Sequence, residues 1–140
     1  MPTKKVPSKP AQRPRKVLVK TGEDAVKLER VRRLCLALPD TLEKLSHGEP
    51  TFFVNNKVFA MFSDDHHGDG HVSVMIPAAE GEQAALIKAE PGTYYLPPYV
   101  GVKGWVGIEL AAIGDEELAV HLLEAWKLIA AKGRTPRRAS

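Results

Sequence analysis

The chain has 140 residues, 44% hydrophobic and 26% charged, which is typical of one globular domain and excludes a collagen-like or wholly disordered chain. No apolar run reaches the roughly 18 residues that a membrane span needs, and the charged, proline-containing start lacks the apolar segment of a secretory signal. The single cysteine cannot form an intrachain disulfide, so we expect a soluble cytoplasmic protein.

The net charge of +3 is divided unevenly along the chain. Residues 1–20 carry seven lysines and arginines and residues 132–140 carry four, with no acid in either segment, so the two tails total +11. Residues 21–131 contain nine basic and seventeen acidic residues, which gives −8. The tails are therefore suited to bind phosphate or to act as solubilising extensions, whereas the domain between them is acidic.

The N-terminal half predicts a tail followed by a helix. Four prolines and few apolar residues among the basic ones predict a disordered tail over 1–22. Apolar residues then recur at helical spacing and predict a helix over about 23–38, which Pro39 ends. Cys35 lies on the apolar stripe of this helix, so we expect a buried, unreactive thiol.

The rest of the chain predicts a sheet and two more helices. Strands are expected over 52–54, 58–62, 71–76, 94–96 and 105–110, with Asn55-Asn56 as a two-residue turn. Residues 80–90 predict a short helix, and Asp115 is expected to cap a closing amphipathic helix. The fold class is therefore α+β, with an antiparallel sheet of about five strands packed with N- and C-terminal helices. The domain is expected over 23–131, with a basic tail over 132–140.

Three histidines and three aspartates crowd the segment 64–71. Counted from Asp65, the spacing approximates a calcium loop, but His67 replaces an oxygen ligand and Ile76 stands where the bidentate glutamate belongs. A transition-metal site formed by His66, His67, His71 and the aspartates of this segment stays open as the alternative. Our prediction is a polar hairpin tip that binds no metal.

The motifs of common enzyme classes are missing. The sequence contains no nucleophile elbow, phosphate-binding glycine loop, dinucleotide fingerprint or Cys/His zinc spacing. His47 and Glu49 could pair as acid and base, but their spacing reveals neither a third group nor a pocket. We therefore expect no catalytic residue, no cofactor and no enzymatic activity.

The segment from Tyr94 to Trp105 combines four aromatic residues, two prolines, two glycines and a lysine. Prolines fix φ and remove donors, whereas glycines permit a tight return, so we predict a rigid loop that presents Tyr99 and Lys103. An aromatic ring and a lysine together can stack on a base and hold a phosphate. The alternative is a loop packed on its own core. Trp105 is expected to begin a strand and to lie in the core.

Four segments resemble the MmcQ/YjbR family and follow its order across residues 24–131. They are Cys35-Leu36-Ala37-Leu38-Pro39, Gly48-Glu49-Pro50-Thr51-Phe52, Lys57-Val58-Phe59-Ala60, and Tyr95-Leu96-Pro97-Pro98-Tyr99-Val100-Gly101 with Lys103-Gly104-Trp105-Val106. His47 stands where members often carry tryptophan. The resemblance implies a frataxin-like fold, hairpins comparable with a double-wing DNA-binding motif, and no established reaction or cofactor.

We therefore expect a sequence-tolerant DNA-binding module that uses its tails and the 97–105 loop. The alternative is a small-ligand, metal or protein-interaction domain; the frataxin-like comparison points to iron, although the acids of the first helix are balanced here by basic residues. We expect a monomer without a membrane partner, and a protein partner stays open. The candidate nucleic-acid-binding residues are Lys103, Tyr99, Arg30, Arg32, Arg33, Lys16, Arg15 and Arg13.

Overall fold

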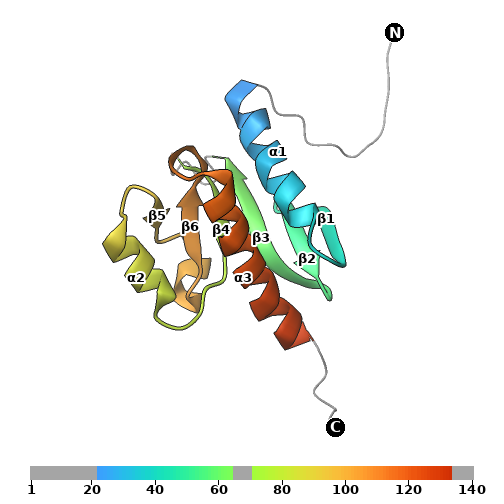
Figure 1. Cartoon of the computed structure of the whole chain (residues 1–140). Helices are drawn as coiled ribbons and strands as arrows, with labels where there is room; N and C mark the ends of the chain where they lie inside the picture. The colour runs from blue at the N-terminus through green and yellow to red at the C-terminus, as the bar shows by residue number, and fades with distance from the viewer. Residues whose placement is uncertain (1–21, 65–70, 134–140) are drawn as a thin grey trace.

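Six antiparallel strands form one sheet in the computed structural model, which describes residues 22–64 and 71–133 (Figure 1). The strands are β1 (Thr41–Ser46), β2 (Glu49–Val54), β3 (Lys57–Asp64), β4 (Val72–Ile76), β5 (Tyr94–Tyr95) and β6 (Val106–Glu109). Their order across the sheet is β1-β2-β3-β4-β6-β5. The helices are α1 (Gly22–Leu36), α2 (Glu82–Ala89) and α3 (Asp115–Gly133), with short 3₁₀ helices η3 (Val100–Lys103) and η4 (Leu110–Ala112). The α+β class expected from the sequence is confirmed.

The sheet has one strand more than the sequence predicted. The additional strand, β1, lies at the edge of the sheet and pairs with β2. Its apolar residues Leu42 and Leu45 are three positions apart, so β1 lacks the alternation of apolar and polar residues that identifies a half-buried strand. Both leucines are exposed. The following hairpin has the expected two-residue turn, with Asn55 and Asn56 at φ 52° and 65°.

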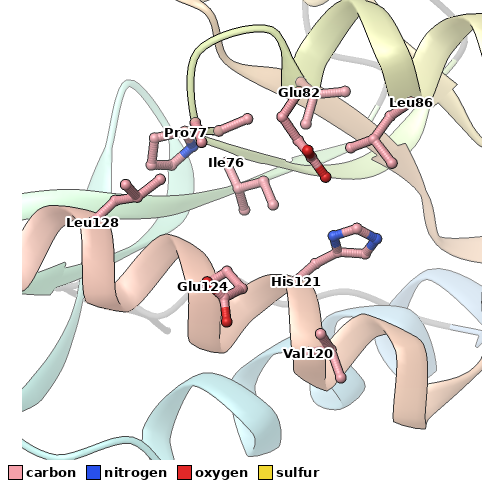
Figure 2. A pocket seen from close by; sticks show the side chains of 11 residues that line it. Ile76, Pro77, Glu82, Leu86, Val120, His121, Glu124 and Leu128 are labelled. Atoms are coloured by element: carbon pink, nitrogen blue, oxygen red, sulfur yellow. The ribbon is translucent and has the colours of Figure 1, made fainter.

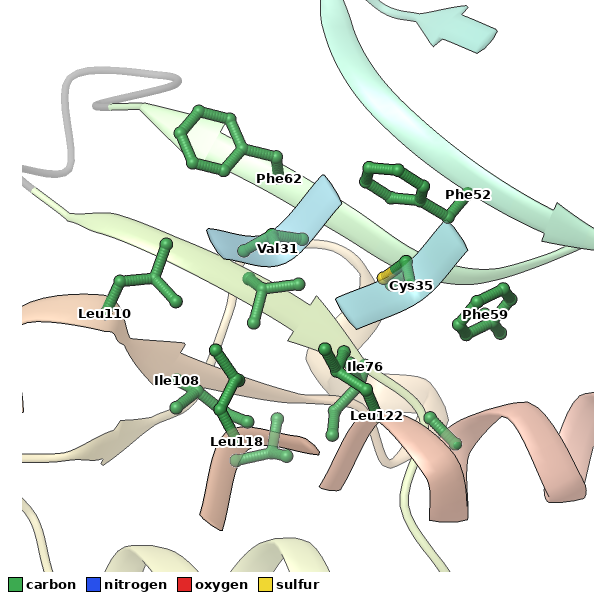
Figure 3. Close-up of a cluster of buried hydrophobic side chains, with 14 of the residues drawn as sticks. Val31, Cys35, Phe52, Phe59, Phe62, Ile76, Ile108, Leu110, Leu118 and Leu122 are labelled. Atoms are coloured by element: carbon green, nitrogen blue, oxygen red, sulfur yellow. The ribbon is translucent and has the colours of Figure 1, made fainter. Parts of the chain in front are cut away.

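The core lies between one face of the sheet and the helices α1 and α3 (Figure 3). Periodicity placed Cys35 on the buried stripe of α1, and the structure confirms this, since the residue is fully buried and burial raises the pKa of its thiol. Within the described residues, no helix is both long and apolar enough to cross a membrane. The largest fully buried side chains include Val31, Phe52, Phe59, Phe62, Ile108, Leu110, Leu118 and Leu122.

The start of β6 differs from the prediction. The strand begins at Val106, and Val106 and Ile108 point into the core with no exposed surface. Because side chains alternate between the two faces of a strand, the preceding Trp105 falls out of phase with them and is only half-buried. Trp105 is therefore not the core residue that the sequence predicted.

Candidate functional site

The segment 96–104, which we call the tip, connects β5 to β6 and presents an apolar surface to solvent. Leu96 is 62% exposed, Tyr99 74% and Val102 93%. Lys103 is exposed as well and forms no ion pair with any described residue. The structure therefore places Tyr99 and Lys103 on the surface, as the sequence predicted.

Tyr99 has a backbone conformation that is rare for a residue with a side chain. Its φ is 66° and its ψ is −64°. The amide N–H of Val100 donates to the carbonyl of Pro98 at 2.7 Å, which closes a three-residue γ-turn around Tyr99. This form of the γ-turn is strained, and such strain persists only where the surrounding structure enforces it.

Hydrogen bonds from α2 and within the tip enforce this shape. The side-chain amide of Gln83, on α2, donates to the carbonyl of Gly101 at 2.8 Å and also to that of Trp105. The N–H of Gly101 donates to the carbonyl of Pro97 at 3.1 Å. A Cβ at Gly101 would lie 2.9 Å from the side chain of Leu96, so a larger residue there would displace this exposed leucine. The tip is thus an exposed but well-fixed structure.

The three arginines proposed as phosphate contacts are all engaged in ion pairs. Arg30 donates to Asp115 at 2.7 Å and to two carbonyls of the segment before α3, and its side chain is 18% exposed. Arg32 makes a bidentate pair with Glu43 at 2.7 and 2.8 Å and also contacts Glu29; the hydrogen bond to Glu43 is the main cause that raises the pKa of Arg32. Arg33 contacts Asp115 at 3.1 Å and is 59% exposed.

These ion pairs give Asp115 and the arginines of α1 structural roles that the sequence did not predict. Asp115 is the first residue of α3, but its carboxylate accepts hydrogen bonds from Arg30 and Arg33 instead of capping the helix, and these bonds lower the pKa of the carboxyl. The arginines therefore join α1 to the start of α3 and to β1.

The remaining candidates, Arg13, Arg15 and Lys16, lie outside the described residues.

The described residues, 22–64 and 71–133, carry ten lysines and arginines against fifteen aspartates and glutamates, which gives them a net charge of −5. The amide of Asn55 in the β2–β3 turn donates to the carbonyl of Ala130 at 3.3 Å, so this turn lies against the end of α3. The exposed Lys57 and Lys132 therefore belong to the end of the domain from which the basic C-terminal tail continues.

A pocket of about 300 Å³ lies between α2 and α3 over the ends of β4 and β6 (Figure 2). Its wall is mainly apolar. Three polar side chains also line it, namely Glu82 from α2 and His121 and Glu124 from α3. In Figure 2 the carboxylate of Glu82 points across the pocket toward the ring of His121.

A buried tyrosine fixes the imidazole of His121. The hydroxyl of Tyr94 lies 2.7 Å from Nε2 of His121, and the two rings meet edge to face. Burial, with the nearby carboxylate of Glu117, raises the pKa of Tyr94 to about 12, so the hydroxyl stays protonated. The sequence could not reveal this contact, because the two residues are 27 positions apart and no short motif joins them.

A second polar cluster lies on the sheet face opposite the helices. Tyr95 lies across Gly107, where a Cβ would come within 2.2 Å of the tyrosine ring. Its hydroxyl contacts the hydroxyl of the buried Ser73 at 2.6 Å, and its ring stacks on His71, whose Nδ1 contacts the carboxylate of Glu109. The polar groups of this cluster thus contact one another.

The structure brings together no metal ligands among the described residues, and the proposed acid–base pair shares only a small pocket of about 30 Å³, which His47 and Glu49 both line. Most of the 64–71 segment, with His66 and His67, lies outside the described residues, and among the described ones no three His, Cys, Asp or Glu side chains gather closely enough to hold a metal ion. His47 is exposed in the β1–β2 turn at φ 54°, and the carboxylate of Glu49 accepts the N–H of Asp64 at 3.1 Å.

Comparison with known proteins addresses the fold and the family. The structure resembles the crystal structure of Deinococcus radiodurans protein DR2400, which has a DUF419 domain, with a TM-score of 0.66 and 22% identity over 78% of this chain and 82% of that one. Comparison with curated proteins gives no match. A model of the YjbR family matches residues 36–128, which is about two thirds of the chain and includes the tip and the pocket. The chain therefore belongs to the YjbR family.

Proposed function

We propose that this protein is a cytoplasmic nucleic-acid-binding module without catalytic activity, in which the tip contacts bases and the basic tails hold the phosphate backbone of DNA. The observation that carries the proposal is Tyr99, an exposed aromatic ring held on a strained γ-turn. Strain at an exposed side chain is a sign of function, because a glycine would fit the same backbone at lower cost.

The tip has the chemistry that base contact requires. Exposed aromatic rings provide stacking platforms that accept any base, and apolar side chains such as Val102 act as wedges between base steps in proteins that bend DNA. Lys103 lies at the other end of η3 from Tyr99 and supplies a positive charge for a phosphate. These properties favour binding with little sequence preference.

The distribution of charge determines which segments besides the tip attract the phosphates of DNA. The described residues carry −5, and the arginines of α1 are paired with carboxylates, so their charge is largely neutralised and attracts phosphate little. The tails carry +11 and are the main source of attraction. If all seven N-terminal charges contact phosphates, log K falls with log salt at a slope of about −6.

The test is a titration of a labelled duplex with the full chain at about 50 and 200 mM salt. Tyr99→Ala should weaken binding roughly 5- to 150-fold, since stacking on one base is worth about 1–3 kcal/mol. Lys103→Ala should reduce the salt slope by about 1. Lys88→Ala, which removes an exposed lysine from α2, is the matched control and should change nothing.

Two results would contradict the proposal. No binding by the full chain at the lower salt concentration would refute a DNA-binding function. Wild-type affinity in both tip variants, together with amide shifts that DNA causes only in the tails, would remove the tip from the interface.

A further inference from the structure

The pocket between α2 and α3 has an apolar wall, two carboxylates and one imidazole, and no lysine or arginine is among the described residues that line it. We propose that it binds a small organic cation, specifically a protonated amine attached to a compact apolar group. This inference is independent of the DNA-binding proposal, because no residue of the tip lines the pocket.

The wall fits the apolar part of such a ligand. Ile76 and Val106 form part of it from the sheet, and Leu86 and Leu128 from the two helices. A volume of about 300 Å³ lies at the small end of the range for small-molecule sites, which suits one ring with a short chain. Apolar lining with a few fixed polar groups is the usual composition of such sites.

The charged groups select a cation. Glu82 and Glu124 line the pocket from the two helices that border it, and no lysine or arginine is among its described lining residues. Lys127 lies 3.7 Å from Glu124, but both side chains are more than half exposed, so water screens this pair. An anionic ligand would meet the carboxylate of Glu82, which forms no ion pair with a described residue, whereas an ammonium group would be attracted to Glu82 and, more weakly, to the exposed Glu124.

His121 adds a polar group whose position is fixed. Its Nε2 is occupied by the hydroxyl of Tyr94, which is 2% exposed. The other ring nitrogen, Nδ1, has no hydrogen-bond partner among the described residues. In the tautomer whose Nε2–H donates to the Tyr94 hydroxyl, which in turn donates to Glu117, Nδ1 keeps its lone pair and can accept a hydrogen bond from an ammonium beside the carboxylate of Glu82 (Figure 2). A metal ion fits less well, since the described residues supply no group of three ligands.

The experiment titrates the ¹⁵N-labelled full chain with three probes of the same shape: 2-phenylethylamine, 2-phenylethanol and 3-phenylpropanoate. We expect the amine to shift the amide signals of residues 76–79, 82–86 and 120–128 and to bind about tenfold more tightly than the alcohol, with the propanoate weakest. Equal or tighter binding of the propanoate would overturn the proposal, as would amine-induced shifts that lie outside these segments.

Variants then separate charge from shape. Glu82→Gln should weaken the amine about three- to tenfold while leaving the affinity for 2-phenylethanol unchanged. Glu116→Gln is the matched control, because it removes an exposed carboxylate of α3 that does not line the pocket. If both variants bind the amine equally well, the pocket carboxylate does not recognise the cation and the inference is wrong. Loss of DNA binding in the tip variants would not affect this result.

Discussion

Replacing Tyr99 by glycine should stabilise the fold. A residue with a side chain in this γ-turn, at φ 66° and ψ −64°, costs about 1–3 kcal/mol of strain, and glycine removes most of it. Glycine is also more flexible in the unfolded chain, which lowers the free energy of unfolding by about 0.5–1 kcal/mol. The ring is 74% exposed, so its loss removes little buried surface. The expected net gain is about 1 kcal/mol, or about 4 °C in Tm for a domain of this size.

Tyr99→Ala is the control that isolates the backbone contribution. Alanine keeps a Cβ and therefore keeps the strain, so its stability should stay within about 0.5 kcal/mol of the parent protein. Urea denaturation of the full chain, with thermal melts alongside, measures both variants. If Tyr99→Gly is no more stable than Tyr99→Ala, the γ-turn carries no strain and the functional argument built on it fails.

The same two variants also test the function of the ring. Both lack the aromatic side chain, so both should bind DNA more weakly, although one of them folds more stably than the parent. A gain in stability together with a loss of binding is the pattern expected where a protein keeps a strained residue for its activity. Normal DNA binding by the glycine variant would show that the ring is not part of the interface.

The other predictions concern groups that hold the fold and the tip. Arg30→Ala should lower the free energy of unfolding by about 2–4 kcal/mol, because two carbonyls lose their charged donor and Asp115 loses one of its two arginine partners. Arg33→Ala should cost less than about 0.5 kcal/mol, and equal losses in urea denaturation would contradict this. Hydrogen bonds from Arg30 and Arg33 hold the pKa of the Asp115 carboxyl below its ordinary value. The stability that these bonds provide is therefore present above the ordinary pKa and is lost as the pH falls through the lowered pKa. The Tm of Asp115→Asn should therefore fall less steeply on acidification than that of the parent, and parallel curves would refute the assignment. Gln83→Ala should cost about 1–3 kcal/mol and speed hydrogen exchange at residues 100–105, and unchanged exchange would show that this side chain does not fix the tip.

The fold was largely predictable, because its helices and central strands have apolar periodicities that depend on neighbouring residues only. Cys35 on α1 and the Asn55-Asn56 turn followed from such local patterns. The edge strand β1 did not, because its exposed Leu42 and Leu45 break the alternation, and its place is determined by pairing with β2. Trp105 was misplaced because its size favoured burial, whereas the phase of β6 decides which side chains point inward.

The candidate sites were predictable only where neighbouring residues in the sequence determine the structure. Prolines and glycines around Tyr99 indicated an exposed, rigid loop, but its positive φ could not be foreseen, since tyrosine seldom adopts it. The ion pair of Arg30 with Asp115 joins residues 85 positions apart, so it could not be predicted from the sequence. The sequence showed only a cluster of arginines on α1, whereas in the structure Arg30 links α1 to α3. The same limit applies to the pocket, where the contact of Tyr94 with His121 arises only from folding.

The distribution of charge makes the two proposed parts of the DNA interface separable. Attraction by the tails comes from counterion release and weakens steeply with salt, whereas stacking on Tyr99 depends little on ionic strength. The acidic domain repels phosphate at low salt, and this repulsion is screened over about 8–10 Å near physiological ionic strength. Raising the salt therefore removes the tails' contribution while it eases the approach of DNA to the domain, so the share of binding that depends on Tyr99 should rise with salt. An interface formed by the tails alone would instead lose its affinity without gaining any dependence on the tip.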